Sequence, residues 1–439
     1  MIEINFTNIM EDTLGDKGIS REEIDALRPE IERVRESLIK REWSDLAFID
    51  LPSFDTSEIK KIAEWVRSDT DDFLLLGIGG SALGPKTILE ALSPFHNYRK
   101  KPRVFICDNV DPTTLSHVIS IINKEKTTVN VITKSGSTAE TMALFMILFN
   151  EIPNIKDRLI ATTDPEKGNL REISLSMGLK SLPIPPGVVG RYSVLSPVGL
   201  LLAEVIGIDS KEILKGARDI NDRCLEPDVW KNPAYMFGTL LYLMEKRKRN
   251  INIIMPYADG LKSLSEWFCQ LWAESLGKDG YGITPYPSVG TIDQHSQLQL
   301  WMDGPDDKVV IFVRIKDYKS DIKIPEVFQD IEGISYLGGH FLSELIKSEA
   351  ESTELALSKR KRPNMTISIP AVDPYHLGQV FQFFEIVTAF TGLLYNINPF
   401  NQPGVEEGKN FTYGIMGKKG FEDKRREVEK AREKKSYKI

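Results

Sequence analysis

Short apolar runs alternate with helical stretches along most of this chain, and this alternation restricts the fold more than any other feature. In the first half, each apolar run ends in a loop of Gly, Ser, Asp or Thr that leads into a helical pattern. The runs are Phe73–Ile78, Val104–Cys107, Val129–Thr133 and Leu159–Thr162. Strands that alternate with helices are typical of parallel sheets with helices on their faces. The sequence therefore predicts an α/β fold.

A second set of apolar runs predicts a second α/β unit, after a helical region at about 197–248. Its strand candidates are Ile251–Met255, Val309–Ile315 and Met365–Ile369. A chain of 439 residues is long enough for two or three domains. We expect a helical entry segment at 1–50, a first α/β domain at 51–200, a helical connection at 201–229, a second α/β domain at 230–400 and a C-terminal helical segment at 401–439.

The charge balance excludes partners that need a strongly basic surface. The chain carries 56 basic and 63 acidic side chains, for a net charge of −7, so local cations must hold any anionic ligand. Its three cysteines lie far apart, without the spacing of a metal site. No apolar run approaches the roughly 18 residues that span a bilayer. We expect a cytoplasmic protein with no metal and with neither nucleic-acid nor membrane partners.

Two loops that follow apolar runs are candidate phosphate sites. Glycines in Gly77–Pro85 let backbone N–H groups approach an anion at the start of a helix. The same loop fits a dinucleotide fingerprint, with Asp108 where a ribose-binding acid would sit, and a tight turn without ligand is a further alternative. In Thr133–Thr141, the first six residues contain four hydroxyls and a lysine at a helix start, as in a phosphate site or a cluster of N-caps. A second such loop argues against a dehydrogenase.

Arg191 and Glu274 are candidates for charge stabilisation and proton transfer. Arg191 lies in Gly187–Ser193, a segment short of other charges, and could stabilise an oxyanion or be a surface arginine in a turn. Glu274 shares a helical face with Gln270 and follows aromatic residues that could desolvate it. It is either a base or an ordinary helix carboxylate.

Three further polar residues lie later in the chain. His295 stands in a polar loop, where an imidazole would move protons near neutral pH, although a histidine without function is the alternative. Gln402 and Lys409 are seven residues apart and would share a face if one helix continues through both.

In this order, the segments resemble the glucose-6-phosphate isomerase (phosphoglucose isomerase) family. The motifs are Gly-Gly-Ser, Lys-Ser-Gly-Ser-Thr, Gly-Arg-Tyr-Ser, Glu-Ser-x-Gly-Lys, Gln-His and Gln-x-Gly-Val-Glu-x-x-Lys, from about Leu74 to Lys409. The resemblance implies two sugar-isomerase domains of the flavodoxin-like, doubly wound type and a homodimer with shared active sites. It also implies the interconversion of glucose 6-phosphate and fructose 6-phosphate through a cis-enediol intermediate, without a cofactor.

The resemblance also implies a role for each site residue. Glu274 would be the base that moves a proton between C1 and C2, and Arg191 would stabilise the cis-enediolate. His295 and Lys409 would open the sugar ring. The phosphate pocket would consist of Thr133, Ser135 and Thr138 with Lys134 and the backbone around Gly80 and Ser81, and Gly190, Gln270 and Gln402 would complete the substrate site.

Three positions depart from the family pattern without removing a functional side chain: Val189 where Gly or Pro is common, Ser137 in place of Thr, and Asn401 in place of Asp. A NAD-dependent dehydrogenase and a non-catalytic sugar-phosphate sensor are rival interpretations, and the complete set of Glu274, His295, Arg191 and Lys409 argues against both. A bifunctional isomerase that also accepts mannose 6-phosphate stays open.

Overall fold

The computed structural model describes residues 1–433 and 436–437, and its first sheet is wholly parallel. Its strands are β2 (Asp72–Leu76), β3 (Arg103–Cys107), β4 (Thr127–Ile132), β5 (Leu159–Thr163) and β6 (Lys180–Pro183), in the order β3-β2-β4-β5-β6. This is the order of a flavodoxin-like, doubly wound sheet, in which the chain reverses its direction of winding beside the first strand. The point of reversal lies between β2 and β4.

The second sheet combines four parallel strands with a strand from the N-terminus. Its strands are β7 (Ile251–Pro256), β8 (Thr284–Pro287), β9 (Lys308–Ile315), β10 (Asn364–Ile369) and β1 (Glu3–Asn5), in the order β1-β10-β9-β7-β8. The edge strand β1 runs antiparallel to β10. The entry segment at 1–50 therefore contributes a strand that was not predicted from the sequence.

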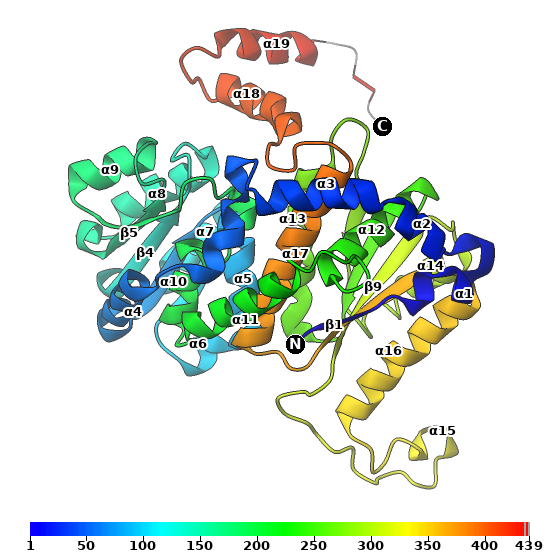
Figure 1. Ribbon diagram of the computed structural model, residues 1–439. Coiled ribbons are helices and arrows are strands. Elements are labelled where there is room, and N and C mark those ends of the chain that lie inside the picture. Colours follow the sequence, from blue (N-terminus) through cyan, green and yellow to red (C-terminus); the bar gives the residue numbers. More distant parts are fainter. Residues whose placement is uncertain (434–435, 438–439) are drawn as a thin grey trace.

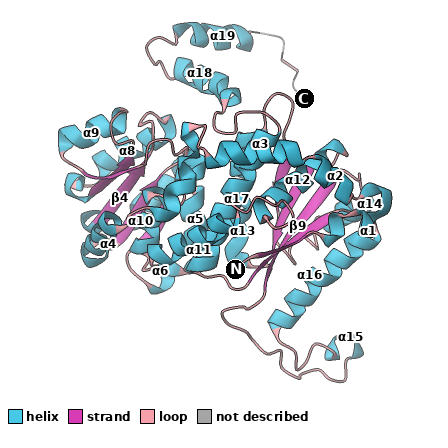
Figure 2. Cartoon of the chain, viewed as in Figure 1, coloured by secondary structure: helices cyan, strands magenta, loops and turns pink. Residues whose placement is uncertain are grey.

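Helices separate the two sheets, as Figures 1 and 2 show. The helices of the first half are α1 (Glu11–Leu14), α2 (Arg21–Ala26), α3 (Arg28–Ile39), α4 (Ser57–Asp69), α5 (Leu83–Leu92), α6 (His96–Arg99), α7 (Pro112–Ile121), α8 (Ala139–Glu151), α9 (Asn169–Met177), α10 (Pro197–Val205) and α11 (Ser210–Arg223). Those of the second half are α12 (Pro233–Lys246), α13 (Lys262–Leu276), α14 (Leu298–Asp303), α15 (Glu332–Ser335), α16 (Leu342–Lys359), α17 (Pro374–Leu394), α18 (Glu406–Ile415) and α19 (Glu422–Arg432).

The centre of this helical layer is α17, which packs against α11, α12 and α13. Every residue from Leu377 to Leu394 is buried. Among the described residues, α17 alone is long and apolar enough to cross a membrane, and the 18 residues of its most apolar stretch are all buried inside the fold. No run of that kind was expected, because Gln379, Gln382 and Glu385 interrupt its apolar residues. A helix that is apolar on nearly all sides is stable as the core of a large domain.

Two segments project from this body. The chain around α15 extends beyond α16, and the pair α18 and α19 lies apart from the sheets near the C-terminus (Figure 1). These two C-terminal helices pack against each other through Tyr413 and Phe421, whose ring centroids are 5.2 Å apart. Helix α18 carries Lys409, and this residue lies at the cavity described below.

Candidate active site

A cavity of about 920 Å³ opens at the carboxyl ends of the strands of the first sheet. The loops that follow β2, β4, β5 and β6 line one side, and residues of α13, α18 and the segment before α18 line the other. It therefore lies where the strand order reverses, the usual ligand position in an open α/β sheet. Every predicted site residue except His295 lines it: Gly80, Ser81, Thr133, Lys134, Ser135, Thr138, Gly190, Arg191, Gln270, Glu274, Gln402 and Lys409.

The guanidinium of Arg191 is held by a hydrogen bond from each of its N–H donors. The residue is only 3% exposed, and an unpaired charge would be costly at such depth. Its acceptors are Ser275 Oγ (2.7 Å), Glu274 Oε2 (3.1 Å), Gln402 Oε1 (2.9 Å) and the carbonyls of Pro399 (2.8 Å) and Asn401 (3.2 Å). This network fixes a planar cation in the cavity wall.

Glu274 projects from α13, and each of its two carboxylate oxygens accepts a hydrogen bond. Oε2 accepts from Arg191, and Oε1 accepts from Nε2 of Gln270 at 3.0 Å, one helical turn earlier. The Glu274 side chain keeps 36% of its surface exposed. A carboxylate that is positioned by neighbours yet reachable from the cavity has the geometry of a general base.

The glycine loop after β2 passes very close to Gln270 and to the backbone beside Arg191. Gly79 has a φ of +57°, and a Cβ there would lie 2.6 Å from Nε2 of Gln270. A Cβ on Gly80 would lie 2.3 Å from the carbonyl oxygen of Gly190. Only glycine allows this backbone approach, which brings the loop after β2 against the residues beside Arg191.

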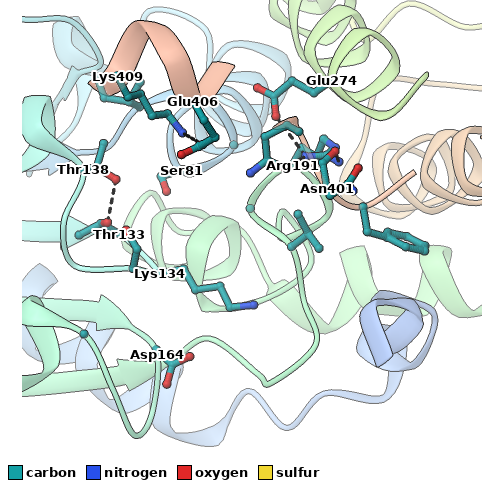
Figure 3. Close-up of a pocket in the computed structure, with 18 of the residues that line it drawn as sticks. Ser81, Thr133, Lys134, Thr138, Asp164, Arg191, Glu274, Asn401, Glu406 and Lys409 are labelled. Atoms are coloured by element: carbon teal, nitrogen blue, oxygen red, sulfur yellow. Dashed lines mark hydrogen bonds and ion pairs between the residues drawn. The ribbon is translucent and has the colours of Figure 1, made fainter. Parts of the chain in front are cut away.

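The loop after β4 gathers hydroxyl groups at the start of α8. The hydroxyls of Thr133 and Thr138 lie 3.1 Å apart (Figure 3), and Ser135 Oγ accepts from the backbone N–H and the hydroxyl of Ser137. Thr138 is the N-cap of α8, but its side chain makes no capping hydrogen bond. Free backbone N–H groups at a helix N-terminus together with nearby hydroxyls form an anion site.

The ammonium group of Lys134, in the same loop, turns away from these hydroxyls. Figure 3 shows its side chain extending away from Ser81, Thr133 and Thr138, and its Nζ donates to the carbonyl of Val188 at 2.9 Å. Burial lowers the pKa of Lys134. Because Val188 precedes Arg191 by three residues, this bond ties the phosphate-type loop to the loop that carries the guanidinium.

Known sequences and structures resemble this chain over most of its length. A sequence profile described as phosphoglucose isomerase matches residues 58–431. The chain belongs to the phosphoglucose isomerase family. A glucose-6-phosphate isomerase of Carboxydothermus hydrogenoformans is 40% identical over 98% of both chains. Another, of Rubrobacter xylanophilus, is 48% identical over 82% of this chain and 86% of the relative.

Membership in the phosphoglucose isomerase family confirms the resemblance seen in the motifs and makes the protein an isomerase. The crystal structure of a hypothetical protein from Thermus thermophilus, 35% identical, superposes with a TM-score of 0.86 over 95% of this chain and 100% of its own. A glucose-6-phosphate isomerase from Chlamydia trachomatis shares the fold at 23% identity, with a TM-score of 0.80 over 95% of this chain and 88% of its own. The α/β fold class, with parallel sheets, is thus also confirmed.

In this phosphoglucose isomerase family member, His295 lies outside the cavity of its own chain. The residue is exposed, in the loop between β8 and α14. The other predicted ring-opening group, Lys409, lies on α18 at the cavity and pairs with Glu406 at 2.8 Å (Figure 3). One chain therefore brings together all the predicted site residues but one.

Asp164, Lys167 and Glu406 were not predicted from the sequence, although all three line the cavity of this phosphoglucose isomerase homologue. Asp164 directly follows β5, and its Oδ1 accepts from the backbone N–H groups of Glu166 (3.0 Å) and Lys167 (3.1 Å). The carboxyl ends of neighbouring parallel strands meet at one edge. The loop after β5 could thus have been predicted as part of the site in the same way as the loops after β2 and β4, because it also follows the carboxyl end of a strand.

Proposed function

We propose that this protein interconverts D-glucose 6-phosphate and D-fructose 6-phosphate through ring opening and a cis-enediol intermediate. The observation that carries the proposal is the pairing of Glu274 with the fixed guanidinium of Arg191, in a cavity that also contains a hydroxyl-rich anion loop. The names of the relatives support this activity rather than a bifunctional phosphoglucose and phosphomannose isomerase. We accordingly propose a cytoplasmic enzyme of glycolysis and gluconeogenesis that needs no cofactor.

The chemistry needs a base and a charge stabiliser, because a proton beside a sugar carbonyl is only weakly acidic. Glu274 removes the proton from C2 of the open-chain aldose, a double bond forms between C1 and C2, and O1 takes up the negative charge. Arg191 stabilises that charge. Glu274 then returns the proton to C1 while the proton of the C2 hydroxyl moves to O1, which leaves the ketose. Gln270 and Gln402, already bonded to this pair, position the sugar.

The phosphate group of the substrate binds at the opposite end of the cavity. The hydroxyls of Thr133, Ser135 and Thr138 donate to it, together with backbone N–H groups of the loop that contains Lys134. Backbone groups of Gly80, Ser81 and Gly190 border the same space. This leaves C1 and C2 of the open chain beside Glu274.

Ring opening needs proton transfer between the ring oxygen and the anomeric hydroxyl, which we assign to Lys409 and to the His295 of a second copy. The exposed position of His295 supports a homodimer with shared active sites. Apolar side chains near His295 are also exposed, with Ile292 at 61% and Leu300 at 51%. The projecting segment around α15 exposes Phe328 and Tyr336 as well. Clusters of exposed apolar side chains mark protein contacts.

One assay series tests the function against its rivals. Purified protein is offered glucose 6-phosphate, mannose 6-phosphate and NAD with glucose 6-phosphate in separate coupled assays. We expect fructose 6-phosphate from glucose 6-phosphate, and no NADH in the third assay. Turnover of mannose 6-phosphate at a comparable rate would replace the proposal with the bifunctional isomerase. Binding of glucose 6-phosphate without turnover would indicate a sensor.

A further inference from the structure

The loop after β5 packs directly on the hydroxyl loop after β4. Gly136 has a φ of +64°, and a Cβ there would lie 2.3 Å from the backbone nitrogen of Leu170. Gly168 has a φ of +100°, and a Cβ there would lie 2.6 Å from the carbonyl oxygen of Ser135. The two loops therefore form one backbone-to-backbone surface, and Lys167 stands beside this contact.

The described cations that line the cavity are Lys134, Lys167, Arg191 and Lys409. Three of them are engaged: Lys134 with a carbonyl, Arg191 with five acceptors and Lys409 with Glu406. Lys167 is exposed, and within residues 1–433 its ammonium has no hydrogen-bond or ion-pair partner. It is thus the lysine on this wall that is free to meet a ligand.

A phosphate monoester at neutral pH carries nearly two negative charges, whereas hydroxyls and backbone N–H groups are neutral donors. The chain as a whole is negative, so a local cation must balance the substrate. A lysine on a flexible stem can supply such a point charge. Burial lowers the pKa of Lys134 and the charge of Lys167 adds to that lowering, so the two ammonium groups lie within electrostatic range of each other.

We propose that Lys167 supplies the positive charge that binds the phosphate group of the sugar phosphate, while Lys134 is a positioning residue that holds the loop before Arg191. The proposal rests on the isomerase function above and reassigns the cation within its phosphate pocket. In this assignment Lys167 contacts only the phosphate group, so its contribution to binding is the same in the ground state and in the transition state. Its loss changes KM and leaves kcat nearly unchanged.

The test measures binding of inorganic phosphate to the full-length protein by calorimetry, and KM and kcat for glucose 6-phosphate. Lys167→Met should weaken phosphate binding and raise KM on the order of 10- to 100-fold, as expected for a charge-assisted hydrogen bond. Lys167→Arg should restore most of the affinity. Lys231→Met, at an exposed lysine outside the cavity, is the matched control and should change nothing.

Lys134→Met separates the two lysines. It should lower kcat through the loop before Arg191 and weaken phosphate binding less than Lys167→Met does. Unchanged phosphate affinity in Lys167→Met, or a larger loss in Lys134→Met, would overturn the proposal even if wild-type protein isomerises glucose 6-phosphate. A wild-type protein that does not isomerise it would instead refute the proposed function, and the phosphate titration would still decide which lysine binds the anion.

Discussion

The guanidinium of Arg191 is buried, and every one of its N–H donors has an acceptor. Glu274 supplies the balancing charge, and the other four acceptors are neutral oxygens. Lysine cannot reproduce this planar fork. Arg191→Lys should therefore lower kcat on the order of 10²–10³-fold, the loss typical of a missing oxyanion donor. Steady-state kinetics measure it, with circular dichroism to verify folding, and a kcat near the wild-type value would exclude this role.

Lys278 makes a contribution to the free energy of unfolding that depends on pH. Its ammonium donates to the carbonyl of Glu274 at 2.8 Å, and burial together with the charge of Arg191 lowers the pKa of Lys278 to about 8. In the unfolded chain a lysine holds its proton up to about pH 10.4. Between these values the unfolded state binds more protons, so the contribution of Lys278 to the free energy of unfolding rises with pH.

Lys278→Met removes this contribution. Urea unfolding of both proteins at about pH 7.5 and pH 10 isolates it, because all other groups titrate alike. The wild-type free energy of unfolding, minus that of the variant, should be larger at the higher pH. A difference that is constant or falls with pH would show that the pKa of Lys278 is not lowered.

Residue types were predictable from the sequence, but side-chain directions were not. Hydroxyls and a lysine at a helix start correctly mark a loop at the cavity. The ammonium of Lys134 turns away because the fold brings the carbonyl of Val188, which is 54 residues away, within 2.9 Å. Nothing local indicates that contact. Lys167 was not predicted because a single lysine in a turn forms no sequence pattern that indicates a function.

At the scale of elements, all the central strands were predictable, whereas three of the four edge strands were not. The central strands β2 and β4 are buried along their whole length and gave clear apolar runs. The missed strands β1, β6 and β8 lie at sheet edges, with three or four residues each and mixed exposure, whereas the predicted edge strand β3 has five residues. Two prolines also interrupt β8, and proline is tolerated only where a backbone N–H need not pair.

The contact between the loops after β4 and β5 predicts the effect of one methyl group. Gly136→Ala places a Cβ against the backbone of Leu170 at a positive φ. Gly178→Ala is a matched control, since Gly178 has a φ of +65° and open space around it. In the Gly178→Ala control, the free energy of unfolding should fall only by the roughly 1–2 kcal/mol that a left-handed backbone conformation costs a residue with a Cβ. Gly136→Ala should lower the free energy of unfolding, measured in urea, by more than this, and it should also weaken phosphate binding. Equal losses in the two variants would contradict the packing of the two loops.

At the scale of the whole molecule, the site depends on residues far apart in the chain. The first sheet supplies the anion loops, α13 supplies Glu274, and the C-terminal segment supplies Gln402 and Lys409. These segments were predictable as motifs, but only the resemblance placed them in one site. The exposed His295 is the residue that a single chain leaves outside.

A homodimer with shared sites predicts complementation between inactive variants. When His295→Ala and Glu274→Gln proteins exchange subunits, some dimers contain one site with both intact groups. Mixing should therefore restore part of the activity, and each variant alone should stay inactive. Fluorescence energy transfer between labelled variants verifies the exchange. Proven exchange without any recovery would place His295 and Glu274 in the same chain's site or remove His295 from the reaction.

The central claim is that Glu274 isomerises the sugar by proton transfer, and heavy water tests it most directly. With wild-type protein, glucose 6-phosphate recovered from D₂O should carry deuterium at C2, detected by nuclear magnetic resonance. Glu274→Gln keeps the shape and the hydrogen bonds but removes the basic oxygen. It should lower turnover on the order of 10²–10⁴-fold and abolish the exchange while substrate still binds. Near-normal turnover by the variant, or isomerisation by the wild type with no deuterium uptake, would contradict the account.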